Sequence, residues 1–208
     1  MDKTFEYCLA HTTPPGAILR ELERETHLRT IAPHMLSGPY QGAFLRFVSH
    51  MIRPQRILEV GTFTGYASIC LAEGLAAGGL LHTIESDEEL AWIFHTYIHK
   101  AGLEARIRLH TGDAAAVIPL LDESFDLVFL DGGKPDYELH YELCLPKTRP
   151  GGMLLADNVL WDGKVARRDQ SDPTARVLDR FNNLVHRDPR VENILLPFRD
   201  GLMMMRKL

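Results

Sequence analysis

Two acidic segments of the chain carry residue types that could bind a divalent cation. Asp131 directly follows the apolar run Asp126–Leu130. Asp157 and Asn158 stand side by side after a second apolar run, Gly152–Ala156. Two carboxylates and one amide oxygen form an all-oxygen donor set, which suits Mg²⁺ or Ca²⁺ better than zinc. Because each aspartate alone fits a helix N-cap or a hydrogen-bonded turn equally well, the metal hypothesis depends on both segments together.

Lys134 adds a candidate proton acceptor to the first segment, in the run Asp131-Gly132-Gly133-Lys134. A lysine that is partly removed from water beside a metal has a lowered pKa. Such a lysine can take a proton from a hydroxyl group of a substrate. We therefore expect Lys134 to act as a general base.

A glycine-rich turn between Arg56 and Tyr66 is the strongest indication of a cofactor. An apolar run ends in Glu59-Val60-Gly61, Gly65 follows four residues later, and a helical pattern then begins. A strand, a tight glycine turn and a helix N-terminus together form the geometry that holds a nucleoside cofactor. The spacing E-x-G-x-x-x-G differs from the dinucleotide fingerprint, whose second glycine is replaced by Phe63. This difference favours S-adenosylmethionine over NAD.

Two further strand ends carry residues that fit a nucleoside. Glu85 ends the run Leu80–Glu85, where its carboxylate could accept hydrogen bonds from both ribose hydroxyls. Gly112-Asp113-Ala114 ends the next run and could border an adenine. Alone, Glu85 fits an exposed strand end equally well, but a charge at the end of a buried strand needs a partner. The nucleoside hypothesis therefore rests on Glu85 and the glycine turn together.

Histidine and cysteine patterns give no competing site. His95 and His99 have the i, i+4 spacing of zinc-binding pairs, but Thr96 stands where the H-E-x-x-H motif requires glutamate. The three cysteines are far apart and odd in number, which indicates reduced, buried thiols.

Apolar runs alternate with helical patterns along most of the chain, which predicts βαβ units and a doubly wound, mostly parallel α/β sheet. An Asp200-Gly201 turn between two strand-like runs predicts an antiparallel hairpin at the C-terminus. The predicted strands are Arg56–Val60, Leu80–Glu85, Ile107–His110, Asp126–Leu130, Gly152–Ala156, Val191–Leu196 and Leu202–Lys207. The predicted helices are Ala17–Leu28, Gln41–Met51, Gly65–Gly74, Asp87–Ala101, Ala114–Leu120, Asp136–Leu145 and Thr174–Arg187.

Length and charge limit the class of protein. The chain has 208 residues, which suits a single domain over 1–208 with a helical N-terminal segment at about 1–52. A net charge of −5 argues against binding to nucleic acid or to a membrane surface. No run resembles a signal peptide or a membrane span, so we expect a cytoplasmic protein.

Taken together, these motifs resemble those of the cation-dependent O-methyltransferases of the caffeoyl-CoA and catechol type. The resemblance covers about residues 30–208. It is carried by three segments: Ile57 to Tyr66, which is similar to the first cofactor motif of the family; Phe129 to Tyr137, which is similar to its aspartate–lysine–tyrosine segment; and Gly151 to Trp161, which is similar to its second metal segment.

This resemblance implies a Rossmann-like class I methyltransferase fold and a homodimer. It also implies a metal, usually Mg²⁺, on Asp131, Asp157 and Asn158, with Lys134 as the general base. The acceptor would be a vicinal dihydroxy-aromatic molecule that lies between the metal and the methyl donor. The residues implied near S-adenosylmethionine are Ser37, Glu59, Gly61, Thr62, Glu85, Ala114 and Asp131.

Two alternatives stay open at this point. The chain could be a methyltransferase without a metal, in which Asp131 and Asp157 are structural, or a protein that binds S-adenosylmethionine without catalysis. The residues Met35, Tyr40 and Trp161 could form an apolar wall over an aromatic acceptor or take part in ordinary packing. The sequence does not name the acceptor.

Overall fold

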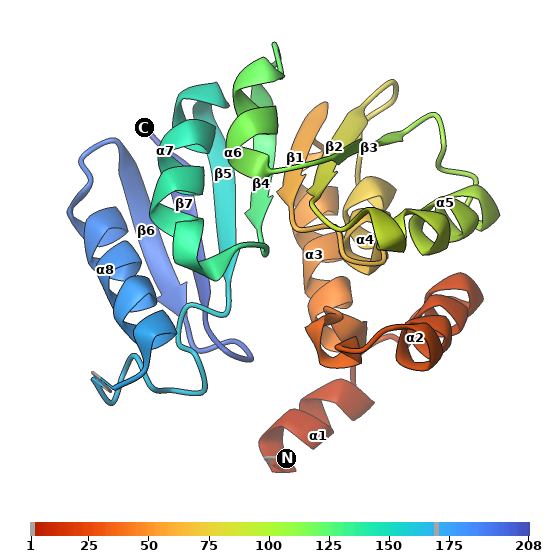
Figure 1. The fold of residues 1–208 in the computed structure, drawn as a ribbon, viewed down its shortest axis with the longest axis horizontal. Coiled ribbons are helices and arrows are strands. Elements are labelled where there is room, and N and C mark those ends of the chain that lie inside the picture. The colour runs from red at the N-terminus through yellow and green to blue at the C-terminus, as the bar shows by residue number, and fades with distance from the viewer. Residues whose placement is uncertain (1–2, 169–170) are drawn as a thin grey trace.

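A computed structural model describes residues 3–168 and 171–208, and its centre is a seven-stranded sheet (Figure 1). The strand order is β3-β2-β1-β4-β5-β7-β6. The first five strands run parallel, whereas β7 is antiparallel to both β5 and β6. The strands are β1 Arg56–Val60, β2 Leu80–Glu85, β3 Ile107–Thr111, β4 Phe125–Leu130, β5 Thr148–Asp157, β6 Val191–Leu196 and β7 Leu202–Lys207.

Helices cover both faces of this sheet (Figure 1). Helices α2, α3, α4 and α5 pack on one face of the sheet through one apolar cluster. Helices α6, α7 and α8 pack on the other face through a second cluster. Because the central strands are buried on both sides, their sequences are continuously apolar rather than alternating. The helices are α1 Lys3–Ala10, α2 Ala17–Arg29, α3 Gly38–Ile52, α4 Tyr66–Glu73, α5 Ala91–Lys100, α6 Ala114–Val117, α7 Tyr137–Lys147 and α8 Pro173–Arg187; the 3₁₀ turns are η1 Pro33–Met35, η2 Glu88–Leu90, η3 Ile118–Leu120 and η4 Lys134–Asp136.

The predicted fold class is confirmed, and β1 and β2 begin and end at the predicted residues. Two predicted helices are each divided into a 3₁₀ turn and an α-helix, at η2–α5 and α6–η3. Pro119 accounts for the second division, since proline has no amide hydrogen to donate in a helix interior. The sequence patterns did not indicate α1, which has no buried side chain and projects from the rest of the molecule (Figure 1).

The order of the strands determines where a ligand can enter. Strands β1 and β4 are neighbours at the centre of the sheet. The chain leaves β1 toward β2 on one side, and it leaves β4 toward β5 on the other side. Open α/β sheets bind ligands in the crevice that this divergence creates at the carboxyl ends of the strands. Gly61, Glu85, Asp131 and Asp157 all lie at these ends.

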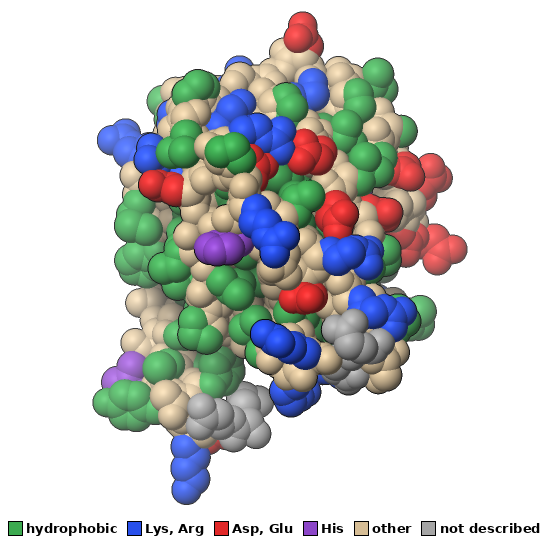
Figure 2. All heavy atoms as spheres, turned by 90° about the vertical axis from the view of Figure 1, so that its left-hand side faces the viewer, with side chains coloured by type: hydrophobic (Ala, Val, Ile, Leu, Met, Phe, Trp, Pro, Cys, Tyr) green, Lys and Arg blue, Asp and Glu red, His purple; other side chains and the backbone are tan. Residues whose placement is uncertain are grey.

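Two features of the molecule concern membranes and polyanions. In the described part of the chain, no helix is both long and apolar enough to span a bilayer. Basic and acidic side chains are interspersed over the face shown in Figure 2, with hydrophobic side chains between them. This face therefore does not present a continuous basic surface to a polyanion.

Candidate active site

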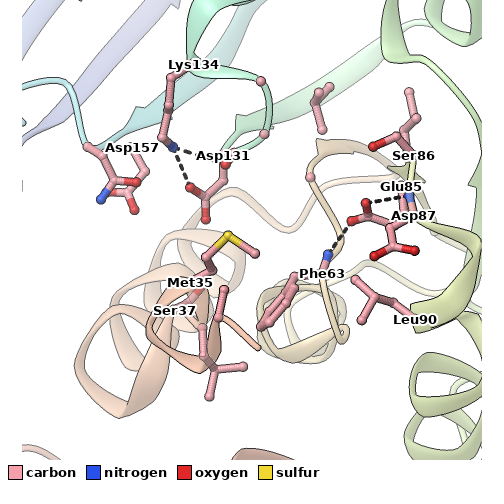
Figure 3. A pocket seen from close by; sticks show the side chains of 18 of the residues that line it. Met35, Ser37, Phe63, Glu85, Ser86, Asp87, Leu90, Asp131, Lys134 and Asp157 are labelled. Atoms are coloured by element: carbon pink, nitrogen blue, oxygen red, sulfur yellow. Dashed lines mark hydrogen bonds and ion pairs between the residues drawn. The ribbon is translucent and has the colours of Figure 1, made fainter. Parts of the chain in front are cut away.

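One cleft of about 1210 Å³ lies at the carboxyl ends of β1, β2, β4 and β5. The segment that contains Met35 and Ser37 lines it from the N-terminal side. Figure 3 shows Asp131, Lys134 and Asp157 at one end of the cleft and Glu85 at the other. The two groups of residues predicted from the sequence therefore share a single cavity.

The glycine turn after β1 brings two strand ends into backbone contact. Gly61 has a φ of +97°, a conformation that favours glycine. A Cβ on Gly61 would lie 2.5 Å from the backbone nitrogen of Gly132, which follows β4. Glycine at both positions thus lets the ends of β1 and β4 approach each other at the floor of the cleft.

Glu85 is held in place by two backbone amides. Its Oε2 accepts a hydrogen bond from the Phe63 nitrogen at 2.7 Å, and its Oε1 accepts one from the Asp87 nitrogen at 3.0 Å (Figure 3). Each carboxylate oxygen has a second lone pair that stays available. Glu85 lines the cleft, so it is placed to accept hydrogen bonds from the hydroxyl groups of a ligand.

Glu59 and Thr62, by contrast, do not line this cleft, although Thr62 lines a second cavity of about 10 Å³ that shares Ser37, Gly61 and Asp131 with it. Glu59 is fully buried, and its Oε2 accepts hydrogen bonds from Ser68 and, at 2.6 Å, from Thr83. Thr62 is 3% exposed and shares a 2.5 Å hydrogen bond with the Thr83 hydroxyl. These contacts support the glycine turn from beneath. A side chain at the end of a buried strand can point either to the crevice or into the helix layer, and here both point inward.

Asp131 and Lys134 form a half-buried ion pair at the other end of the cleft. The Nζ of Lys134 lies 2.8 Å from Asp131 Oδ1 and donates a second 2.8 Å hydrogen bond to the Tyr137 hydroxyl. Burial lowers the pKa of Lys134, but the charge of Asp131 and the contact with Tyr137 outweigh burial and raise it above its ordinary value. In this arrangement the ion pair favours the protonated form of Lys134, and the lowered pKa expected for a lysine beside a metal stays a prediction.

Asp157 is the most buried acid of the cleft, at 2% exposure. Its Oδ2 accepts a hydrogen bond from Gln41 Nε2 at 2.8 Å. Within the described residues, its Oδ1 is buried without a hydrogen-bond partner. Burial, and after it the negative charge of Asp131, raise the pKa of Asp157 to about 6, while Lys134 and Gln41 act in the opposite direction.

These residues fit a hard divalent cation in the chemistry of their donors. An unpartnered buried carboxylate oxygen beside a second carboxylate is costly unless a positive charge compensates it. In residues 3–168 and 171–208, no three His, Cys, Asp or Glu side chains lie close enough together to hold a metal ion. Asn158, which lines the same cleft, would have to supply the third protein oxygen.

Comparison with known proteins identifies the family. A model of the O-methyltransferase family matches residues 10–208. The chain belongs to this family. A catechol O-methyltransferase from Niastella koreensis is 34% identical over 168 residues, which cover 79% of this chain and 76% of that protein. A caffeoyl-CoA O-methyltransferase from Populus kitakamiensis is 32% identical over 205 residues, which cover 91% and 86%.

The fold of this O-methyltransferase is shared with solved structures. An O-methyltransferase from Bacillus cereus, crystallised in complex with SAH, is 30% identical, with a TM-score of 0.90. The match covers 98% of this chain and 96% of that one. The seven-stranded sheet with its antiparallel C-terminal pair is therefore the fold of the class I methyltransferases.

The remaining predicted residues of the enzyme fall into two groups. Ser37, Ala114, Met35 and Trp161 all line the cleft. Tyr40 instead packs between the rings of Phe5 and Phe198, with ring centroids 5.1 Å from each. Of the three aromatic or apolar wall candidates, Tyr40 is thus a packing residue, because its helix directs the ring toward the C-terminal hairpin.

Gln41 and Arg199 also line the cleft and were not predicted. Gln41 belongs to α3, and Arg199 lies in the turn between β6 and β7, 116 and 42 positions from Asp157. Neither lies at the end of a parallel strand, which was the pattern that located the other residues. The only sequence signal near Arg199 was the Asp200-Gly201 turn, which predicts a hairpin and no chemistry.

Proposed function

We propose that this O-methyltransferase transfers a methyl group from S-adenosylmethionine to a hydroxyl of a vicinal dihydroxy-aromatic molecule, with a divalent cation, Mg²⁺ by preference, at Asp131, Asp157 and Asn158. The observation that carries the proposal is the shared cleft. It joins a nucleoside-compatible end at Glu85 to a carboxylate–lysine end at Asp131 and Lys134.

The Glu85 end is where we place the methyl donor. The fixed carboxylate of Glu85 would accept hydrogen bonds from the ribose hydroxyls, and Gly61 lines the cleft beside it. Ser37 and Ala114 line the same cleft. Relatives of similar fold support this placement, since the Bacillus cereus enzyme was crystallised with SAH, the product left when S-adenosylmethionine loses its methyl group.

The Asp131 end is where we place the acceptor hydroxyls. A bound cation would stabilise the oxygen anion of the acceptor and fix its orientation. Lys134, only 2.8 Å from Asp131, is placed to exchange a proton with a hydroxyl at this end. It can accept that proton only when the negative charge of Asp131 is shared with a second positive charge, because the ion pair raises its pKa.

Alignment and exclusion of water supply the rest of the expected rate enhancement. An anionic oxygen attacks the methyl group of a cationic sulfur, and the oxygen and sulfur are both uncharged in the products. Because charge is lost in the reaction, a site that aligns the reactants and excludes water should raise its rate. Met35 and Trp161 line the cleft and would cover an aromatic ring from water. The names of the relatives, catechol and caffeoyl-CoA O-methyltransferases, support an aromatic acceptor.

Methylation of a panel of dihydroxy-aromatic compounds, with Mg²⁺ and with excess EDTA, tests the proposal. We expect Asp157→Ala to lower kcat/KM by about 100-fold or more, as for loss of electrostatic stabilisation of a transition state, and EDTA to abolish turnover of the wild type. Full turnover in EDTA would show a methyltransferase without a metal. Calorimetric binding of S-adenosylmethionine with no turnover on any compound would show a non-catalytic binding protein.

The expectations of a homodimer and of a cytoplasmic location stay predictions. The first is supported by large apolar side chains that are exposed on the protein surface. Phe47 and Met51 of α3 are 62% and 74% exposed, and Ile194 of the edge strand β6 is 55% exposed. A second copy of the chain would remove such side chains from water.

A further inference from the structure

Arg199 combines a strained backbone with two directed hydrogen bonds beside the cleft. It occupies the turn between β6 and β7 with a φ of +49°, a left-handed conformation that favours glycine. Its Nη1 donates to the backbone oxygen of Ser37 at 2.5 Å and to the side-chain oxygen of Gln41. A conformation of this kind costs energy and persists only where surrounding contacts hold the residue in place.

The contact with Gln41 fixes the orientation of a buried amide. Gln41 is fully buried, and its Oε1 and Nε2 face Arg199 and Asp157 respectively. A guanidinium can only donate hydrogen bonds, so it must face the oxygen of the amide. The amide nitrogen is then the atom that faces Asp157. If the amide were reversed, its oxygen would face the carboxylate and both groups would lose a partner.

The orientation of the amide determines which oxygen of Asp157 is available. Gln41 Nε2 donates to Oδ2 at 2.8 Å and leaves Oδ1, which is buried without a partner among the described residues. We propose that Arg199 is a positioning residue that acts through Gln41 to hold the Asp157 carboxylate ready for a divalent cation at Oδ1. This inference rests on the proposed function, because it takes Asp157 as a ligand of the cation.

The hairpin turn has other anchors, so Arg199 is not needed to hold it in place. The ring of Phe198 stacks on Tyr40 at 5.1 Å and packs on Phe44 at 4.8 Å between centroids. The carboxylate of Asp200 accepts a hydrogen bond from the Asp162 backbone nitrogen at 2.5 Å. Loss of the guanidinium should therefore disturb Gln41 and Asp157 rather than the turn.

Titration of the whole protein with Mn²⁺ in the absence of substrate, followed by electron paramagnetic resonance, tests this role. Arg199→Gly removes the guanidinium and relieves the left-handed strain. We expect it to weaken Mn²⁺ binding by about 10-fold or more, the usual effect of losing a group that orients a metal ligand, without a lower Tm in EDTA. Gln41→Leu should weaken binding similarly, and Arg199→Lys, which still donates to Gln41, should restore part of the affinity.

Arg53→Gly is the matched control. Arg53 is exposed at the far end of α3, is not among the cleft residues, and has a φ of +51°. The substitution relieves the same backbone conformation, so Mn²⁺ affinity should stay at the wild-type value.

Three results would overturn the inference. If both Arg199→Gly and Gln41→Leu bind Mn²⁺ within twofold of the wild type, the positioning role is wrong while the proposed function stands. If Mn²⁺ affinity is unchanged but the KM of the acceptor rises, Arg199 contacts the acceptor directly. If the wild type itself binds no Mn²⁺, the proposed metal site fails and this inference fails with it.

Discussion

The carboxyl group of Glu59 is an uncompensated acid in the interior of the sheet. Its Oε2 accepts hydrogen bonds from Ser68 and Thr83, and its Oε1 is buried with no partner in the part of the chain that the structure describes. Burial raises the pKa of Glu59 to about 8, although both hydroxyl donors act in the opposite direction. A group with this pKa is mostly protonated at neutral pH, and we infer that its position beneath Gly61 is structural.

Glu59→Gln should therefore separate stability from ligand binding. An acid whose pKa is raised in the folded state stabilises fully below its unfolded value of 4.5 and loses this contribution as the pH rises through about 8. The loss amounts to about 1.4 kcal/mol for each pH unit in that window. Glu59→Gln has no carboxyl group to titrate at this position. Its free energy of unfolding, measured in urea, should therefore rise relative to that of the wild type between pH 5 and pH 9.

Calorimetric titration with SAH completes this test, because Glu59 does not line the cleft and the variant should bind as the wild type does. The exposed Glu88 offers a matched control, since Glu88→Gln makes the same exchange of a carboxylate for an amide at the protein surface. A variant that is as stable as the wild type at every pH but has lost SAH binding would contradict the structural role and place Glu59 at the cofactor.

The acidic residues of the cleft could be predicted because the ends of the strands can be recognised in the sequence. Asp131 and Asp157 each terminate an apolar run, and parallel strands that alternate with helices bring such ends to one edge. Gln41 and Arg199 could not be found in this way, since their proximity to Asp157 depends on tertiary packing between α3, the hairpin turn and β5. The inward direction of Glu59 likewise depends on Ser68 of α4, which no spacing indicates.

At the scale of elements, the glycine contact between the ends of β1 and β4 shapes the cleft. A Cβ on Gly61 would lie within 2.5 Å of the Gly132 nitrogen and 2.8 Å of the Gly132 Cα. These are backbone atoms of a paired strand end, and neither can rotate away as a flexible side chain could. The two strands can therefore approach only if both turns lack side chains at this point.

Gly61→Ala should force the two strand ends apart. We expect a loss of about 2 kcal/mol or more in the free energy of unfolding, from strain at positive φ together with a backbone clash, and a loss of SAH binding by calorimetry. Gly78→Ala is the control, because Gly78 has a φ of +73° but no atom within 4 Å of an added Cβ. Equal losses of stability in the two variants would show that backbone strain alone is responsible and that the contact is unimportant.

The elements themselves were largely predictable, but their lateral order at the C-terminus was not. The Asp200-Gly201 turn predicted the β6–β7 hairpin, and the register Leu196 to Leu202 confirms it. That β7 rather than β6 pairs with β5 could not be read from the sequence, since both strands carry apolar residues. The structure gives the reason: Met203 and Met205 of β7 are buried, whereas Glu192, Ile194 and Leu195 of β6 face solvent at the edge.

Across the whole molecule, three buried or half-buried histidines and the buried Glu59 change the stability with pH in opposite directions. His82, His110 and His140 lie on β2, β3 and α7, and burial lowers the pKa of all three. A histidine with a lowered pKa in the folded state stabilises fully above its unfolded value of 6.5 and loses this contribution as the pH falls below it. The protein should thus lose stability through its histidines as the pH falls below 6.5, and through Glu59 as the pH rises from 4.5 to about 8.

His82 should contribute most of the loss of stability at acid pH, because its side chain is 3% exposed and has charged neighbours. Burial lowers its pKa, and His110, Arg108 and Arg56 reinforce this effect, while Glu123, at 2.6 Å, opposes it. His82→Gln removes the titrating ring, so urea midpoints should fall less between pH 7 and pH 5 in the variant than in the wild type. The exposed His27 provides the control, since His27→Gln should keep the wild-type slope. A variant at position 82 with the full wild-type slope would mean that Glu123 prevails over burial and keeps the ring charged in the folded state.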